Sequence, residues 1–81
     1  MRLVSQNGNV DIPYDKAILL HAQGYVMARI GDKDYLMGEY SSMEKSYKVM
    51  EMLQKQFLDY CCNYHSQSGV FCFPKDEEVE V

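Results

Sequence analysis

The residues with the clearest chemical potential are three thiols and one imidazole near the end of the chain. They form the pattern Cys61-Cys62-x2-His65-x6-Cys72, and both side-chain types bind zinc. A tetrahedral zinc site needs four converging ligands, whereas adjacent helical residues point about 100° apart. We therefore expect buried or incidental thiols, with no metal and no other cofactor. Three cysteines in a chain that opens without an apolar signal segment also fit reduced thiols in the cytoplasm.

Carboxylates and a second histidine are the next candidates, for acid–base chemistry. Asp11 with Asp15, and Asp32 with Asp34, form two pairs beside expected turns, where Asp commonly hydrogen-bonds the local backbone. His21 lies in an apolar segment without a recognisable nucleophile pattern around it. No glycine-rich phosphate motif occurs. The sequence therefore predicts a protein that is not an enzyme.

The element that must organise such side chains is the amphipathic segment 41–64. Its apolar residues recur at steps of three and four, which is typical of a helix. Ser41 followed by Glu44 fits a capping box at its start. The apolar stripe needs a sheet face to cover it. Its members are Val49, Met50, Leu53, Phe57, Tyr60, Cys61 and Tyr64.

The residues before this helix have the pattern of strands. Segments 2–5 and 10–12 flank Asn7-Gly8, which favours a tight hairpin turn. Three further segments separated by glycine-bearing turns predict an antiparallel meander; they are residues 17–22, 25–30 and 34–40. A helix over 14–23 is the alternative for the first of them.

These elements predict one α+β domain over residues 1–75. Its antiparallel β-sheet, an N-terminal hairpin plus a three-stranded meander, packs on one long amphipathic helix, with a short C-terminal strand at 70–73. Residues 76–81 are expected to form an acidic tail. A chain of 81 residues builds only a small core, so we expect a homo-oligomer, most simply a dimer.

The charge pattern narrows the choice of partner. The formal net charge is −4, and a basic stripe of the kind that binds duplex nucleic acid is absent from the sequence. Four acids crowd the end of the chain, at Asp76, Glu77, Glu78 and Glu80. They indicate a solubilising tail or a surface that engages a basic partner. No apolar run approaches the roughly 20 residues that cross a membrane.

The seven tyrosines and six methionines suggest a recognition surface on the sheet. If Val26, Ala28, Ile30 and Leu36 face the helix, a second set of side chains lies on the opposite face. Aromatic and methionine side chains adapt to many partners. Coverage of this face by the N-terminal hairpin or a second subunit is the favoured alternative, because a small domain needs the extra burial. The expected set is Tyr25, Met27, Arg29, Tyr35 and Met37.

Three stretches resemble a family of small uncharacterised proteins from Gram-positive bacteria, their prophages and other mobile elements. The stretches are the opening MRLVSQNG with VDIPYD, the helix start YSSMEK with VMEML, and the ending FCFPKDEE. The resemblance covers about half of the chain, and a polar residue is usual at Cys72. The resemblance implies a cytoplasmic protein from phages or mobile elements, and it provides no activity or catalytic residue to transfer.

Together these observations predict a non-enzymatic interaction or regulatory protein that self-associates and binds another protein. An inhibitor of a host nuclease or defence complex is one concrete version. The alternative is a single-stranded nucleic-acid-binding domain that stacks bases on Tyr25 and Tyr35 beside Arg29, although the negative net charge weighs against it.

Overall fold

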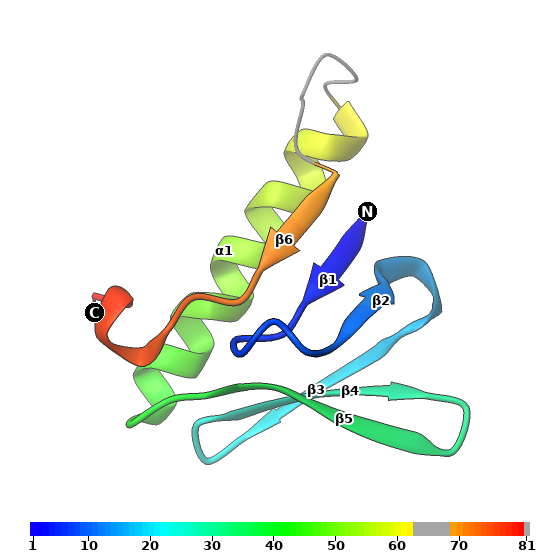
Figure 1. The fold of residues 1–81 in the computed structure, drawn as a ribbon. Coiled ribbons are helices and arrows are strands. Elements are labelled where there is room, and N and C mark those ends of the chain that lie inside the picture. The colour runs from blue at the N-terminus through cyan, green and yellow to red at the C-terminus, as the bar shows by residue number, and fades with distance from the viewer. Residues whose placement is uncertain (63–68, 81) are drawn as a thin grey trace.

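The computed structural model describes residues 1–62 and 69–80, and within them the chain is α+β (Figure 1). Two small sheets and one long helix enclose a single core, which confirms the predicted fold class. The elements are β1 (Arg2–Val4), β2 (Asp11–Pro13), β3 (Ile18–Ala22), β4 (Tyr25–Ile30), β5 (Lys33–Glu39), α1 (Met43–Cys62) and β6 (Val70–Cys72). Short 3-10 turns cover Tyr14–Lys16 and Asp76–Glu78.

The first sheet has the order β2-β1-β6 and joins the two ends of the chain. The hairpin is antiparallel, whereas β6 lies parallel to β1. Leu3 is opposite both Ile12 and Phe71 in this register, and all three side chains are buried. Cys72 lies on the other face and is exposed, because successive strand residues point to opposite sides.

The second sheet is the antiparallel meander β3-β4-β5. Residues 18–22 form a strand, and the competing helix is reduced to the 3-10 turn that precedes them. A β-bulge lies between Val26 and Met27, which are opposite Gly38 and Leu36. Met37 is therefore an extra residue on β5, and the alternation of side chains shifts by one position at this point.

Helix α1 covers the inner face of the meander as predicted, with Val49 and Leu53 fully buried. Its start differs from the prediction. Ser42 accepts a hydrogen bond at Oγ from the Lys45 N–H at 3.2 Å, so Ser42 is the capping residue. The predicted pairing of Ser41 with Glu44 is wrong, because the Ser41 N–H donates instead to Asp76 Oδ1 at 2.8 Å. Tyr64 lies outside the described residues.

The acidic end packs against the domain. Val79 is buried in the core, and the Lys45 Nζ donates to the Asp76 carbonyl at 3.0 Å. Lys75 and Glu78 close the 3-10 turn through a hydrogen bond from the Lys75 N–H to Glu78 Oε1 at 2.9 Å. Residues 76–80 are therefore attached to the start of α1, where the sequence had suggested a solvated tail.

Candidate functional site

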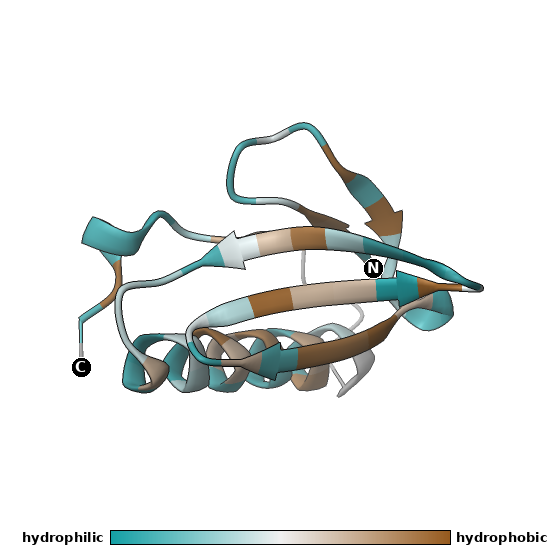
Figure 2. Cartoon of the chain, turned by 90° about the horizontal axis from the view of Figure 1, so that it is seen from below, coloured by the Kyte–Doolittle hydropathy of each residue, from teal (hydrophilic) through white to brown (hydrophobic). Residues whose placement is uncertain are grey.

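The outer face of the meander, opposite α1, is apolar and exposed. The register aligns its side chains in three rows across the strands: Ile18 with Arg29 and Asp34, Leu20 with Met27 and Leu36, and Ala22 with Tyr25 and Glu39. The exposed fractions of Ile18, Leu20, Tyr25 and Leu36 lie between 40% and 60%. Figure 2 views the meander from below, with hydrophobic stretches on all three strands, α1 behind β3 and the N-terminal hairpin on the other side, beyond β5. The N-terminal hairpin therefore does not cover this face.

The bulge changes which side chains belong to the outer face. Met37 was predicted there, but it is fully buried in the core, because the extra residue turns it inward. Tyr35 was also predicted there, but it is opposite Ala28 and packs against the core. Leu36, predicted to face the helix, takes their place. Gly38 is the residue in this strand that could have predicted the bulge, since glycine inside a strand often marks one.

Arg29 is on the outer face, as predicted, but it is already paired. Its Nε donates to Asp34 Oδ1 at 2.7 Å, and the guanidinium also reaches the second carboxylate oxygen. The hydrogen bond from Arg29 lowers the pKa of Asp34. A second pair, Arg2 with Asp11, does the same for the pKa of Asp11 on the first sheet. The outer face therefore offers little free positive charge.

The acidic residues lie near one corner of this face. A surface hollow brings Glu39, at the end of β5, together with the C-terminal acids and part of the opening loop. Its lining consists of Gln6, Asn7, Glu39, Lys75, Asp76 and Glu77. Glu78 and Glu80 are exposed beyond it. The corner is predominantly negative, because Lys75 is its only positive side chain among these residues.

Asp76 holds this corner in place. The hydrogen bond from the Ser41 backbone lowers the pKa of Asp76, and Lys45 adds to the effect from 3.5 Å. Burial, followed by the charges of Asp76 and Glu78, raises the pKa of the Tyr40 phenol. Tyr40 therefore stays protonated, and it donates to the Pro74 carbonyl at 2.7 Å.

We expect Asp76→Asn to lower thermal stability at neutral pH and to match the parent protein in strong acid. A carboxylate with a folded-state pKa below its unfolded value of about 3.9 stabilises the fold above that pH. The contribution is lost as the pH falls through the lowered pKa. Thermal unfolding of both proteins between neutral pH and about pH 2 measures this convergence; a constant difference would contradict it. Glu77→Gln is the matched control.

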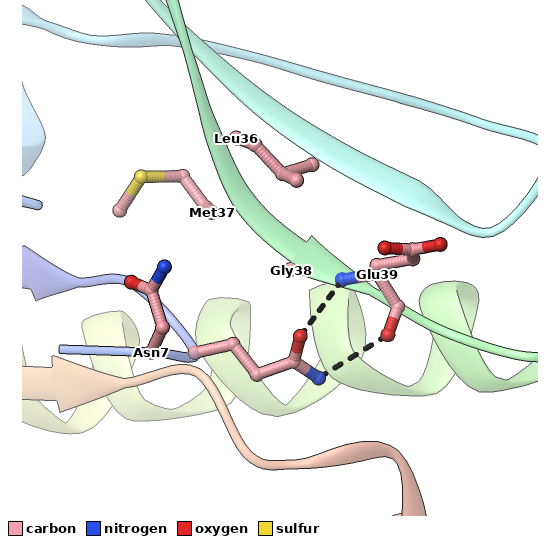
Figure 3. Close-up of a pocket in the computed structure, with 6 residues that line it drawn as sticks. Asn7, Leu36, Met37, Gly38 and Glu39 are labelled. Carbon is pink, nitrogen blue, oxygen red and sulfur yellow. Dashed lines mark hydrogen bonds between the residues drawn. The ribbon is translucent and has the colours of Figure 1, made fainter. Parts of the chain in front are cut away.

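Gln6 joins the corner to both sheets at a pocket that is also lined by Leu36, Met37, Gly38 and Glu39 of β5 (Figure 3). Its N–H donates to the Met37 carbonyl at 2.7 Å, and its side chain accepts from the Glu39 N–H and donates to the Glu39 carbonyl. The same amide donates to the Pro74 carbonyl at 3.1 Å. Gln6 thus occupies the outer edge of β5 around Met37–Glu39, much as a neighbouring strand would.

Gln6, Tyr40 and Pro74 come from three stretches that are far apart in the sequence, and the structure brings them together at this corner. Ser5 and Asn7 fix the adjoining turn through a 2.7 Å hydrogen bond from Ser5 Oγ to Asn7 Oδ1. The polar groups of these residues form hydrogen bonds within the fold. Their role at this corner is therefore structural.

The cysteine pattern is only partly visible. His65 and the side chains of Cys61 and Cys62 lie outside the described part of the chain, so the expectation about zinc stays a prediction. The described residues contain no group of three or more metal-ligating side chains. Among the described elements, no helix has the length and hydropathy to cross a membrane.

No family model, curated protein or solved structure matches the chain. The geometry of the site is an exposed apolar face with a negative corner on a small domain.

Proposed function

We propose that the protein is a non-enzymatic binding module that docks another protein on the outer face of the meander. The observation that carries the proposal is the continuity of this face: four large apolar side chains on three adjacent strands remain 40–60% exposed. Contiguous apolar surface of this kind is typical of protein-binding sites. Tyr25 and Met27 lie near its centre, and both residue types favour recognition.

The charges suggest the kind of partner. Arg29 is neutralised by Asp34, and Glu39 links the apolar rows to the acidic corner with Asp76 and Glu77. The chain as a whole carries a net charge of −4. A complementary partner therefore has an apolar centre with basic residues along one side. A cytoplasmic host nuclease or defence complex, inhibited by occupation of its basic channel, is the concrete version that we favour.

The nucleic-acid alternative requires Tyr25, Tyr35 and Arg29 on one face. Tyr35 packs on the opposite face and Arg29 is paired, so no observation favours this alternative as a second function. Labelled oligonucleotides at low and high salt provide the control: salt-sensitive binding in the micromolar range would contradict the protein-binding proposal.

We expect Met27→Lys to abolish partner capture while leaving the domain folded. Met27 is half-buried in the middle row of the outer face, and a charge there must be desolvated when a partner docks. The measurement is affinity capture from host extract with mass spectrometry, in which one protein must be retained by the parent chain and lost with Met27→Lys. Lys55→Met on the charged side of α1 is the matched control and should retain it. Equal retention by both variants would contradict the proposed surface.

A further inference from the structure

We infer that two copies of this chain pair through β3 and through the flank of α1 beside it, so that two meanders form one continuous sheet. This inference concerns a different surface from the proposed docking face and stands independently of it. Self-association alone was expected from the small size of the chain. The structure adds which surface pairs and in which register.

The first observation is that β3 is the free edge of the meander. The sheet order places β3 and β5 at its two edges, and Gln6 occupies the edge of β5 around Met37–Glu39. Edge strands of monomeric proteins are usually protected by charged residues or proline. The strand Ile18–Ala22 has the sequence ILLHA and contains neither.

The second observation is that the register of β3 allows it to pair with itself. Gln23 and Gly24 both have positive φ, at 54° and 88°, and form a two-residue hairpin turn. The residues beside such a turn exchange hydrogen bonds, and the bonding alternates along the ladder. The free N–H and C=O groups of Leu19 and His21 therefore point away from β4. A two-fold axis at Leu20 places Leu19 of one copy opposite His21 of the other, so both sets of free groups are satisfied.

The third observation is an uncharged stripe along α1 beside this edge. At about 100° per residue, Met43, Tyr47, Met50 and Leu58 fall within about 80° of arc on one flank of the helix. Met43, Tyr47 and Leu58 are more than half exposed. Glu44, Lys48, Glu51, Lys55 and Asp59 all lie on the neighbouring flank, which faces away from the sheet.

The stripe and the free edge are neighbours in space. The ring of Tyr47 packs against that of His21 with centroids 4.8 Å apart, and Phe57 stacks on Tyr14, just before β3, at 4.4 Å. Figure 2 shows α1 running alongside β3. A two-fold axis through the edge would therefore bring the two stripes together beneath the continuous sheet.

The dimensions suit a second copy. A helix of 20 residues spans about 30 Å and is about 10 Å wide with its side chains, and the neighbouring strand adds about 5 Å. An edge of that length and depth presents on the order of 500 Å² in projection. Accessible area exceeds projected area, so this edge approaches the roughly 800 Å² per partner of a standard interface. An isologous interface also needs a self-complementary surface, which the uncharged edge and stripe provide.

The test is the mass of the full chain in solution, measured by light scattering and sedimentation at several concentrations. We expect the parent protein to have twice its chain mass of 9.4 kDa. His21→Pro removes the free N–H, and proline is tolerated where a strand's N–H points outward. We expect this variant to raise the dimer dissociation constant by about tenfold or more. His21→Ala loses the same ring contact but keeps the N–H, so it should remain dimeric.

A second pair of variants covers the case in which His21→Pro does not fold. Leu58→Lys places a charge in the stripe and should give monomers, whereas Met52→Lys, on the far side of the helix, should leave the dimer intact. A parent protein that is monomeric at high micromolar concentration would overturn the inference. Equal dimerisation of Leu58→Lys and Met52→Lys would also overturn it. Retention of the captured partner by monomeric Leu58→Lys would leave the docking face supported, so the two proposals can fail separately.

Discussion

Leu53→Asp is expected to unfold the domain at neutral pH. Leu53 is 1% exposed at the centre of the core between α1 and the sheets. Removing a buried leucine costs about 2–5 kcal/mol in lost packing, and an uncompensated buried charge adds about 3–5 kcal/mol. Together these losses match the whole stability of a domain, about 5–15 kcal/mol, and a chain of 81 residues falls at the low end of that range.

Circular dichroism and urea titration measure the effect directly. The matched control is Met52→Asp, which introduces the same charge one residue earlier at an exposed position. Surface substitutions of this kind usually change stability by about 0.5 kcal/mol or less. A Leu53→Asp protein that still unfolds cooperatively near the parent midpoint would refute the packing of α1 on the sheets.

The helix was the most predictable part of the fold because its stripe depends on local periodicity alone. Val49 and Leu53 were assigned to the core by their spacing, and both are buried. The capping residue was harder to predict, since Ser41 and Ser42 are adjacent and either one fits the pattern of a helix cap. A contact from Asp76, far along the chain, takes the Ser41 N–H and leaves Ser42 as the cap.

The pairing of β6 with β1 could not be predicted from periodicity, because alternation identifies a strand but not the strand beside it.

The bulge limited the prediction of the candidate surface, because an inserted residue is not visible in an alternating pattern. Period-two alternation predicts Tyr25 and Met27 on the outer face, where the structure has them. It also predicts Met37 there, but the inserted residue of the bulge turns Met37 inward and places Leu36 on the outer face. The attachment of the acidic end has its own sequence signal, since Val79 is an apolar residue among the acids and is buried in the core.

Gly24→Ala is expected to destabilise the fold strongly, although it adds only one methyl group. Gly24 has a φ of 88°, in the left-handed region that costs other residues about 1–2 kcal/mol. A Cβ at this position would lie within 3.0 Å of the Tyr40 carbonyl oxygen, closer than real Cβ contacts come. The Tyr40 N–H also donates to the Gly24 carbonyl at 2.8 Å. The hairpin turn and the chain leaving β5 therefore cannot separate without losing a backbone hydrogen bond.

Gly31→Ala separates the conformational cost of positive φ from the steric clash with Tyr40. Gly31 also has positive φ, at 64°, but a Cβ there meets nothing within 4 Å, so only the conformational cost of about 1–2 kcal/mol applies. We expect Gly24→Ala to exceed that loss by about 1–3 kcal/mol, since overpacking against fixed backbone costs about that much. Urea unfolding of the two variants gives the difference. Equal losses would mean that Tyr40 does not approach the turn, and the packing of the segment between β5 and α1 would then be wrong.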